Sequence, residues 1–482
     1  MRLRQRAIKG RAPQNRRRFR NFPLPIDRKF AMDQSPRPGW RMPARAQQPG
    51  YRVSFSSRLQ FDRDNQYHRP IRPSLEKLAA QRSFSFFLRR STEMSTPQVT
   101  VPSRRELIHD VNVYAQSNTA RGVALFTLDI LLYAGAVAGV LFFPPLWAKT
   151  ASSIFAGMAL GRIFSLAHNA AHENIVRGRR LNRVFATILF LPIFYNCRLW
   201  IYEHHALHHP FTNDTKSDAF KPFSKQEFDA LPAWRRWLER FYRSPTVISW
   251  GIYYLIERHW STKIYPPPYL PARLRPAAWL NTALLGVYAA GLLSILAAAP
   301  YYAVNLGTAG ALLLGFALPL FVFEIHDGFA LYVQHTDPRI PWFNTAVDRN
   351  AEGRTELLSV HLVVPRLMGI FYHDVFAHPV HHLHPKVPCY HAYKAQKLLD
   401  SRLGPAAVVR YFGLTWALET SRTCKLYDWD NHQWLSFDGK PTTQPLVVSQ
   451  YAGHGDARRA DAQTRMAGKR SQADGVTATG AT

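Results

Sequence analysis

Histidines at helical spacing form three clusters in this sequence. The chain has 20 histidines, and those in the clusters recur three or four residues apart. On a helix this spacing places side chains on one face, about one turn apart, so each cluster would direct two or three ring nitrogens toward a common point. The clusters are His168 with His172, His205 with His208 and His209, and His378 with His381 and His382.

The number of clustered histidines indicates what they bind. Eight neutral imidazoles packed together would be poorly hydrogen-bonded unless a cation organised them. A structural zinc ion takes about four ligands, usually with cysteine among them, and a haem needs only one or two axial histidines. Iron accepts imidazole, and eight or nine ligands divide naturally between two ions with open positions for O2. We therefore predict a di-iron centre, with two zinc ions as the alternative.

Four apolar stretches are long enough to cross a bilayer, which takes about 20 residues. The first and second are joined by a short connection, as are the third and fourth, so the four should form two hairpins. We predict an all-α, multi-pass membrane protein in which a helical cap outside the bilayer holds the histidine-rich site. The predicted spans are 123–143, 150–167, 279–299 and 302–323.

The loop charges indicate how these hairpins are oriented. Their two tips carry one basic residue, Lys149, whereas the long connection 173–278 and the flanking segments are rich in Lys and Arg. Basic loops tend to stay on the cytoplasmic side, so the tips should face away from the cytoplasm. All three histidine clusters then share the cytoplasmic face. We expect an integral membrane protein, in the inner membrane if the source is bacterial, with its catalytic face in the cytoplasm.

The two ends of the chain differ from this central part. The formal net charge is +29, and residues 1–93 alone hold 23 Lys or Arg against 6 Asp or Glu, with no stretch that could bury a core. We predict that 1–93 is a disordered basic extension, either an over-extended gene start or a targeting segment. No folded module organises its charges, so nucleic acid is not an expected partner. The membrane domain is predicted over 94–425, followed by a tail, 426–482, that is largely disordered at its end.

Longer motifs surround the histidines. The second cluster lies in WIYEHHALHHPFTN, the third lies in FYHDVFAHPVHHLHPKVPCYHAYKA, and the segment after the fourth span reads YVQHTDPRIPWF. With these motifs the chain resembles the membrane fatty acid desaturase superfamily, in particular its acyl-lipid desaturases, over roughly residues 105–420. Two departures are that His384 stands where the family usually has Phe, and that His204 adds one residue before the second cluster.

The resemblance implies two iron ions, O2 as co-substrate, a lipid or fatty acyl substrate, and an external electron donor of ferredoxin or cytochrome b5 type. It implies that the clustered histidines are the metal ligands, with His335 of the QHTDP segment as a ninth. In the second cluster His205 is expected to bind rather than His204, because only His205 has the HxxHH spacing. No catalytic residue is expected beyond the ligands. Residues expected to surround the ligands without binding metal are His204, His326, His373 and Asp374.

The expected reaction is oxidation of a C–H bond, most simply the introduction of a C=C double bond into an acyl chain. The same scaffold supports hydroxylation, terminal-alkene-forming decarboxylation and carotenoid ketolation, so these stay open, as does a metal-binding membrane protein without enzymatic activity. Basic residues on the cytoplasmic face could hold a carboxylate, a thioester or a phospholipid head group, although ordinary positive-inside charge explains them more simply. They are Arg177, Arg179, Arg180, Arg235 and Arg236.

Overall fold

The computed structural model describes the membrane domain and the first part of the tail. The described residues are 101–214, 218–344, 353–446 and 448. The predicted extension 1–93 and the end of the predicted tail lie outside them. Within the described part the chain is mostly helical, and its short strands form two two-stranded sheets. The prediction of a helical membrane fold is therefore confirmed, with the strands as a small addition.

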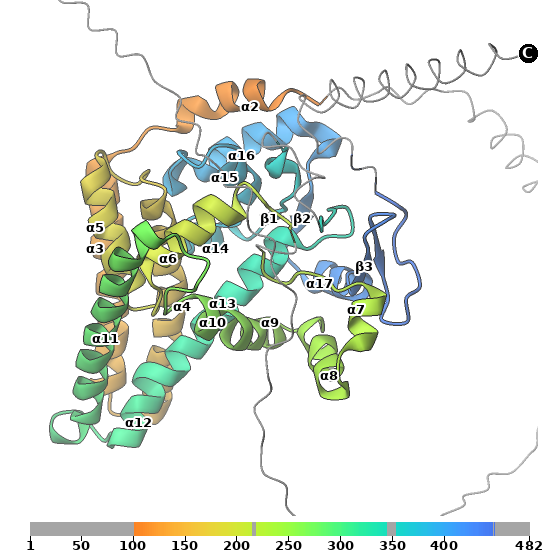
Figure 1. Ribbon diagram of the computed structural model, residues 1–482. Helices are drawn as coiled ribbons and strands as arrows, with labels where there is room; N and C mark the ends of the chain where they lie inside the picture. Colours follow the sequence, from red (N-terminus) through yellow and green to blue (C-terminus); the bar gives the residue numbers. More distant parts are fainter. Residues whose placement is uncertain (1–100, 215–217, 345–352, 447, 449–482) are drawn as a thin grey trace, which may run out of the picture. The chain divides into compact units, whose positions relative to one another are not determined.

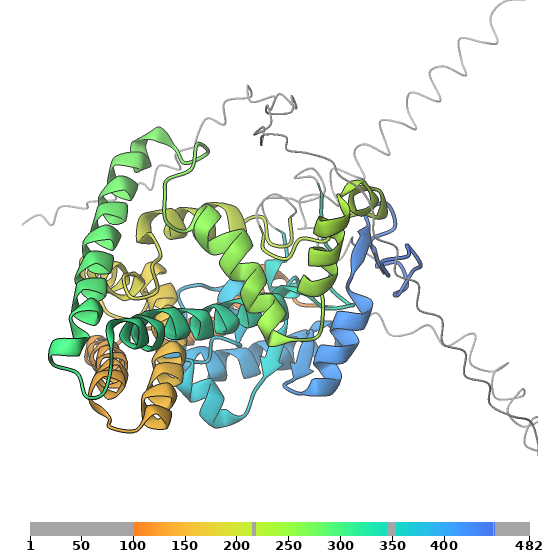
Figure 2. The same cartoon turned by 90° about the horizontal axis from the view of Figure 1, so that it is seen from below.

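Four helices are long and apolar enough to cross a membrane, and they overlap the four predicted spans. They occupy the lower left of Figure 1, where α11 and α12 reach farthest from the cap. Figure 2 shows the same spans gathered on one side of the molecule when it is viewed from below. The spans are α3 (Thr119–Phe142), α4 (Leu146–Ala171), α11 (Arg275–Ala297) and the continuous stretch Thr308–His335.

The fourth span is built from three pieces. They are α12 (Thr308–Leu312), the π-helical segment η6 (Leu313–Ala317) and α13 (Leu318–His335). A stretch of 28 residues rises about 42 Å at 1.5 Å per residue, which exceeds the hydrocarbon core of about 30 Å. The last turns of α13 therefore extend past the bilayer and carry His335 into the cap.

The first hairpin turns tightly at Pro144 and Pro145, which separate α3 from α4. The Lys149 side chain is buried at this turn, and its ammonium group donates to the carbonyl oxygens of Val140 (3.0 Å) and Leu141 (3.1 Å). These carbonyls belong to the last turn of α3, where no intrahelical partner is left for them. Lys149, the one basic residue of the two hairpin tips, thus caps the carboxyl end of α3.

The cap is formed by the connection between the second and third spans and by the chain that follows the fourth. Its first part consists of α5 (Arg179–Phe190), α6 (Cys197–Tyr202), the π-helical segment η2 (Glu203–His208), α7 (Lys225–Ala230), α8 (Ala233–Tyr242), α9 (Val247–Tyr253), the π-helical segment η3 (Tyr254–His259) and α10 (Trp260–Thr262). Its second part contains α14 (Arg366–Phe371), α15 (His378–Leu383), α16 (Cys389–Leu403) and α17 (Leu414–Thr423). Helix α2 (Arg104–Val111) buries Leu107 and Val111 in a core shared with α16, at the top of Figure 1.

Two small sheets complete the cap. They consist of β1 (His361–Val363) parallel to β2 (Val409–Tyr411), and of β3 (Leu426–Asp428) antiparallel to β4 (Gln433–Leu435). In the second sheet Tyr427 and Trp434 are fully buried and pack in one core with Trp342. The packed domain thus continues through this hairpin, beyond the boundary predicted at residue 425.

A buried charge network ties the cap to the spans. Asp129 of α3 lies 2.5 Å from the Arg162 guanidinium of α4 and 2.7 Å from the His373 ring, and all three are buried. Arg162 also donates to the carbonyl oxygen of Phe371 at 2.6 Å. A charge left unpaired in an apolar interior is costly, so each member depends on the others. The network holds the segment before α15 against the helix that carries His168.

Helices α9 and α13 approach so closely that each carries a glycine at the contact. A Cβ atom on Gly328 would lie 2.3 Å from the Trp250 carbonyl oxygen, and one on Gly251 would lie 2.7 Å from Ile325 Cα. Both neighbours are backbone atoms, so neither can move without shifting its whole helix. The glycines therefore set the distance between α9 and the span that ends at the site.

We expect Gly328→Ala to destabilise the protein by about 1–3 kcal/mol, the usual cost of overpacking a core. Thermal unfolding in detergent would measure this as a lower midpoint. Gly286→Ala is the matched control, because this exposed glycine of α11 has no atom within 4 Å of the added Cβ. An equal midpoint for the two variants would contradict the close packing of α9 on α13.

Candidate metal centre

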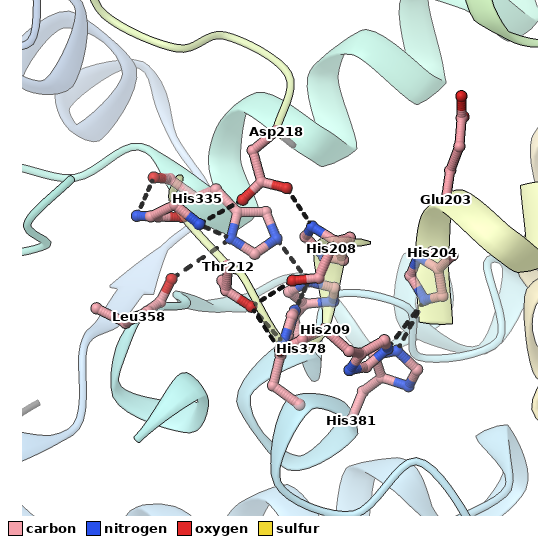
Figure 3. Close-up of polar contacts among 12 residues, drawn as sticks. Glu203, His204, His208, His209, Thr212, Asp218, His335, Leu358, His378 and His381 are labelled. Carbon is pink, nitrogen blue, oxygen red and sulfur yellow. Dashed lines mark hydrogen bonds and ion pairs between the residues drawn. The ribbon is translucent and has the colours of Figure 1, made fainter. Parts of the chain in front are cut away.

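Eight histidines form two groups of four, and within each group one ring nitrogen from each histidine lies within 4.8 Å of the others. The two groups are supplied by the end of α4 and by η2, α13 and α15, which are far apart in the sequence. Figure 3 shows the labelled histidines of both groups turned toward one another. Cluster A is His168, His172, His204 and His381, and cluster B is His208, His335, His378 and His382.

Cluster A is held together by close contacts between ring nitrogens. His168 Nε2 lies 2.9 Å from the Nε2 atoms of both His204 and His381, and those two atoms are 3.4 Å apart. The His172 ring centroid lies 5.1 Å from that of His168. His172 Nε2 is buried and has no hydrogen-bond partner among the described residues.

Cluster B has the same character. His378 Nε2 lies 2.9 Å from the Nε2 atoms of His335 and His382. The ring of His208 is nearly perpendicular to that of His335, and the two ring centroids are 4.8 Å apart. His208 Nε2, like His172 Nε2, is buried and unpartnered within the described part of the chain.

Three histidines of cluster B have an oxygen atom at the other ring nitrogen. The pairs are His208 Nδ1 with Asp218 Oδ1 (2.5 Å), His335 Nδ1 with Asn213 Oδ1 (3.2 Å) and His382 Nδ1 with Thr212 Oγ1 (3.3 Å). Each oxygen can accept a proton held on Nδ1, and the lone pair of Nε2 then faces the cluster. This arrangement is the one that orients histidines at metal sites.

Burial keeps the imidazoles neutral. Desolvation, with smaller contributions from neighbouring histidines, lowers the pKa of His172, His204 and His381 well below its usual value, and it does the same for His378 and His382. Neutral rings whose Nε2 lone pairs face one another at 2.9 Å repel unless a cation lies between them. The donor set, eight nitrogens with two orphaned Nε2 atoms, therefore fits bound metal, one ion in each cluster.

The structure places His204, rather than His205, in cluster A. Residues Glu203–His208 form a π-helical turn, in which the backbone N–H of His209 donates to the carbonyl oxygen of His204, five residues back, at 3.0 Å. The wider turn absorbs the extra residue, so His204 and His208 both belong to the clusters, while His205 lies against His172 and belongs to neither. A spacing argument that assumes an α-helix selects His205. The π-helical turn is the physical reason why the structure has His204 in the cluster instead.

The remaining two histidines of the second motif lie next to the clusters. The His205 ring centroid is 4.2 Å from that of His172, but its own Nε2 is buried without a partner among the described residues. Burial lowers the pKa of His205 to about 4. His209 Nε2 lies 3.0 Å from His204 Nε2, and its ring lies 4.7 Å from those of both His381 and His382. His209 therefore stands between the two clusters.

The other residues that we expected around the ligands lie farther out. His326 stacks on Tyr372 with ring centroids 4.2 Å apart and lines the same cavity as the clusters. His373 bonds to Asp129, and Asp374 forms an ion pair with Arg366. These two side chains thus contact partners outside both clusters, and their contacts hold the segment that leads into α15.

Sequence reasoning missed the residues that orient the histidines. Thr212 and Asn213 belong to the PFTN end of the second motif, so the motif could have identified them as residues of the site. Asn213 has a positive φ of 58°, a conformation that Asn tolerates better than most residues. The backbone N–H of Asn213 donates to Asp218, whose carboxylate thus binds both this amide and His208. No spacing rule points to Asp218, because it lies outside the second motif.

A cavity lies against both clusters, and we call it the histidine-lined cavity. Its polar wall includes His168, His204, His208, His335 and His378. Its apolar wall includes Phe164, Trp200, Ala330, Leu331 and Val375. The cavity thus presents an apolar surface directly beside the histidines.

Comparison with known proteins agrees with this geometry. Residues 144–414, more than half of the chain, match the family model for fatty acid desaturase. The chain is 28% identical over 307 residues to the sn-1 oleoyl-lipid 12-desaturase of Synechocystis sp., an alignment that covers 62% of this chain and 83% of that relative. The matched residues include both clusters.

Two further relatives carry related names. The omega-6 fatty acid desaturase, chloroplastic, of Spinacia oleracea is 25% identical over 311 residues, covering 63% of this chain and 64% of that relative. The sn-1 acyl-lipid omega-3 desaturase (ferredoxin) of Nostoc sp. is 23% identical over 300 residues, covering 60% of this chain and 77% of that relative.

Adjacent histidines allow a matched test of the π-helical register. His204→Ala should weaken metal binding at least about tenfold, because cluster A loses a nitrogen. Removal of a residue that only orients a ligand already lowers metal affinity about 10–100-fold. His205→Ala should leave the metal content close to that of the unaltered protein. Metal analysis of the two purified variants measures both outcomes. Retained metal in His204→Ala together with loss in His205→Ala would show that the α-helical spacing is right.

Proposed function

Because the chain belongs to the fatty acid desaturase family, and is thus an oxidoreductase, we propose that it introduces a C=C double bond into the acyl chain of a membrane lipid, using O2. The observation that supports this most is the pair of buried, neutral histidine clusters beside a cavity with an apolar wall. Iron suits this donor set, since imidazole is one of its ordinary ligands and no thiolate lies in either cluster.

We propose that the metal is a pair of iron ions. One ion would be held by cluster A and the other by cluster B, with His209 between them as a ninth nitrogen. When bound, the iron supplies the oxidising power needed to remove hydrogen from an unactivated methylene group, which no side chain can do alone.

The protein's own residues position the reactants. Asp218, Asn213 and Thr212 hold protons on the outer ring nitrogens, and this keeps the Nε2 atoms directed at the metal positions. Phe164 and Trp200 form part of an apolar wall that keeps water away from the reacting methylene groups. The last turns of α13 raise His335 beyond the bilayer, so the chain of a membrane lipid has only a short distance to travel to reach the site.

The relatives suggest the finer details of this proposal. The names of two of them specify acyl groups of lipids, which favours a lipid-bound acyl chain over a free acid or thioester. The Nostoc relative's name includes ferredoxin, so a ferredoxin-type protein is the proposed electron donor. The catalytic face is proposed to lie in the cytoplasm, because the basic loops and both clusters lie on the side opposite the hairpin tips.

Expression in a host that makes oleoyl lipids but no dienoic acids would test the reaction. Mass spectrometry of the host's fatty acids should show a new product two mass units below its precursor, and purified protein should hold about two irons per chain. A hydroxylated acid, a terminal alkene or an oxidised carotenoid would instead identify a different oxidation on the same scaffold. Iron-loaded protein that yields no oxidised lipid with ferredoxin and O2 would overturn the proposal.

His335→Ala examines the contribution of the fourth span to the site. As a ligand of cluster B, His335 should be needed for both turnover and full iron content, so the variant should lose activity and iron together. A purely orienting role would lower affinity or activity only about 10–100-fold. His391→Ala serves as the control, because His391 lies near Tyr390 and outside both clusters. Full iron and substantial activity in His335→Ala would exclude the ligand role.

A further inference from the structure

Five charged side chains line part of the histidine-lined cavity, which also has apolar residues, histidines, Tyr254 and Gln334 in its wall. The five are Glu203, Asp218, Arg258, Lys263 and Asp327. A hydrocarbon chain does not lie against charges without cost, so this part of the cavity is unsuited to the tail of a lipid. The charged part of the cavity therefore suits the polar end of an acyl chain better than its tail.

The carboxylates of this group are already engaged within the protein. Glu203 accepts from Lys263 at 2.6 Å and from the Tyr269 hydroxyl at 2.5 Å. Asp327 Oδ2 accepts from the Tyr195 hydroxyl at 2.6 Å, whereas its Oδ1 is buried without a partner among the described residues. Asp218 accepts from His208 and from the backbone amide of Asn213.

Arg258 differs from its neighbours. Its Nε atom is buried and has no hydrogen-bond partner among the described residues. No carboxylate of that part of the chain forms an ion pair with its guanidinium, although the field of Glu203 acts on it. A guanidinium offers five donors in a planar fork that matches carboxylate and phosphate oxygens. An arginine held in this state is ready to bind an oxygen that the protein does not itself supply.

Arg258 also joins the histidine-lined cavity to a second one, which we call the polar cavity. The two share Asp218 and Arg258, and the polar cavity is otherwise lined by charged and aromatic residues that include Lys221, Arg235 and Glu257. Arg235 is paired with Glu239 and Glu257, whereas Lys221 is exposed at this cavity. A group with oxygen atoms bound to Arg258 would thus have a polar space beside it.

We propose that Arg258 binds the polar end of the acyl substrate, by its carboxylate or by its ester or phosphate oxygens, and so fixes which end of the chain enters the histidine-lined cavity first. This proposal rests on the proposed function. It assigns the head-group contact to a residue other than the basic residues of the loops. Of those, Arg179 is bonded to Glu173 and Arg177 to the Ser117 carbonyl oxygen, and neither lines the two cavities.

Equilibrium binding by the iron-loaded full-length protein, under anaerobic conditions and without an electron donor, tests this without turnover. The probes are oleic acid, dioleoylphosphatidylglycerol and octadec-9-ene, which has the chain but no polar end. Arg258→Met keeps most of the side-chain volume and removes the charge. It should weaken binding of at least one polar probe about 10–100-fold, the effect of losing a charge-assisted hydrogen bond, and leave octadec-9-ene unchanged.

The choice of polar probe identifies the source of the oxygens. Weaker binding of oleic acid alone would indicate a free carboxylate, and weaker binding of the phospholipid would indicate a lipid head group. Arg258→Lys should restore part of the affinity, because it returns the charge without the planar fork. Arg198→Met is the control, since Arg198 is exposed on α6 and lines neither cavity.

Two outcomes would overturn the assignment. One is unchanged affinity for both polar probes in Arg258→Met, and the other is an equal loss for octadec-9-ene, which would show a structural role. Iron content of each variant confirms that the clusters are intact. Failure of the unaltered protein to bind any probe, or to desaturate lipids, would count against the proposed function instead, so the two failures are distinguishable.

Discussion

Neutral imidazoles that face one another in a dry interior are the constraint on which the rest of this structure depends. In cluster B the Nε2 atoms of His335 and His382 bring no proton to His378 Nε2 at 2.9 Å, because these two rings donate from Nδ1 to Asn213 and Thr212. A shared cation resolves the repulsion and would contribute its binding free energy to the folded state. The site is therefore both a functional centre and the means by which distant helices are joined.

The scaffold meets this constraint by bringing rigid elements to one point. Helices α4 and α13 are membrane spans whose ends carry His168, His172 and His335 beyond the apolar region. The segment before α15 is attached to the same spans through Asp129, Arg162 and His373, which are buried and mutually dependent. Histidines placed on such elements keep their relative positions, which a metal centre requires more than most sites do.

The second motif reaches the site through a locally unfavourable conformation. A π-helical turn is rare and is found mostly at functional sites, where an inserted residue is retained because it re-aims a side chain. Here the inserted residue brings His204 to cluster A, where its ring stacks on Trp200 with centroids 4.3 Å apart. The same turn leaves Glu203 facing Lys263 and Tyr269, so one distortion shapes both the metal centre and the charged part of the cavity.

The sequence by itself determined the features that depend on local periodicity and composition: four spans, three histidine motifs and the family to which the chain belongs. Hydropathy over about 20 residues and helical spacing of three or four residues are properties of short segments, so they can be read without a structure. Only the tertiary structure shows that His204, and not His205, belongs to cluster A, because the ring of His204 contacts those of His168 and His381. It also placed Asp218 beside His208, Arg258 between two cavities, and the hairpin of β3 and β4 within the packed domain. These features depend on contacts between residues far apart in the chain, and such contacts exist only when the helices have packed.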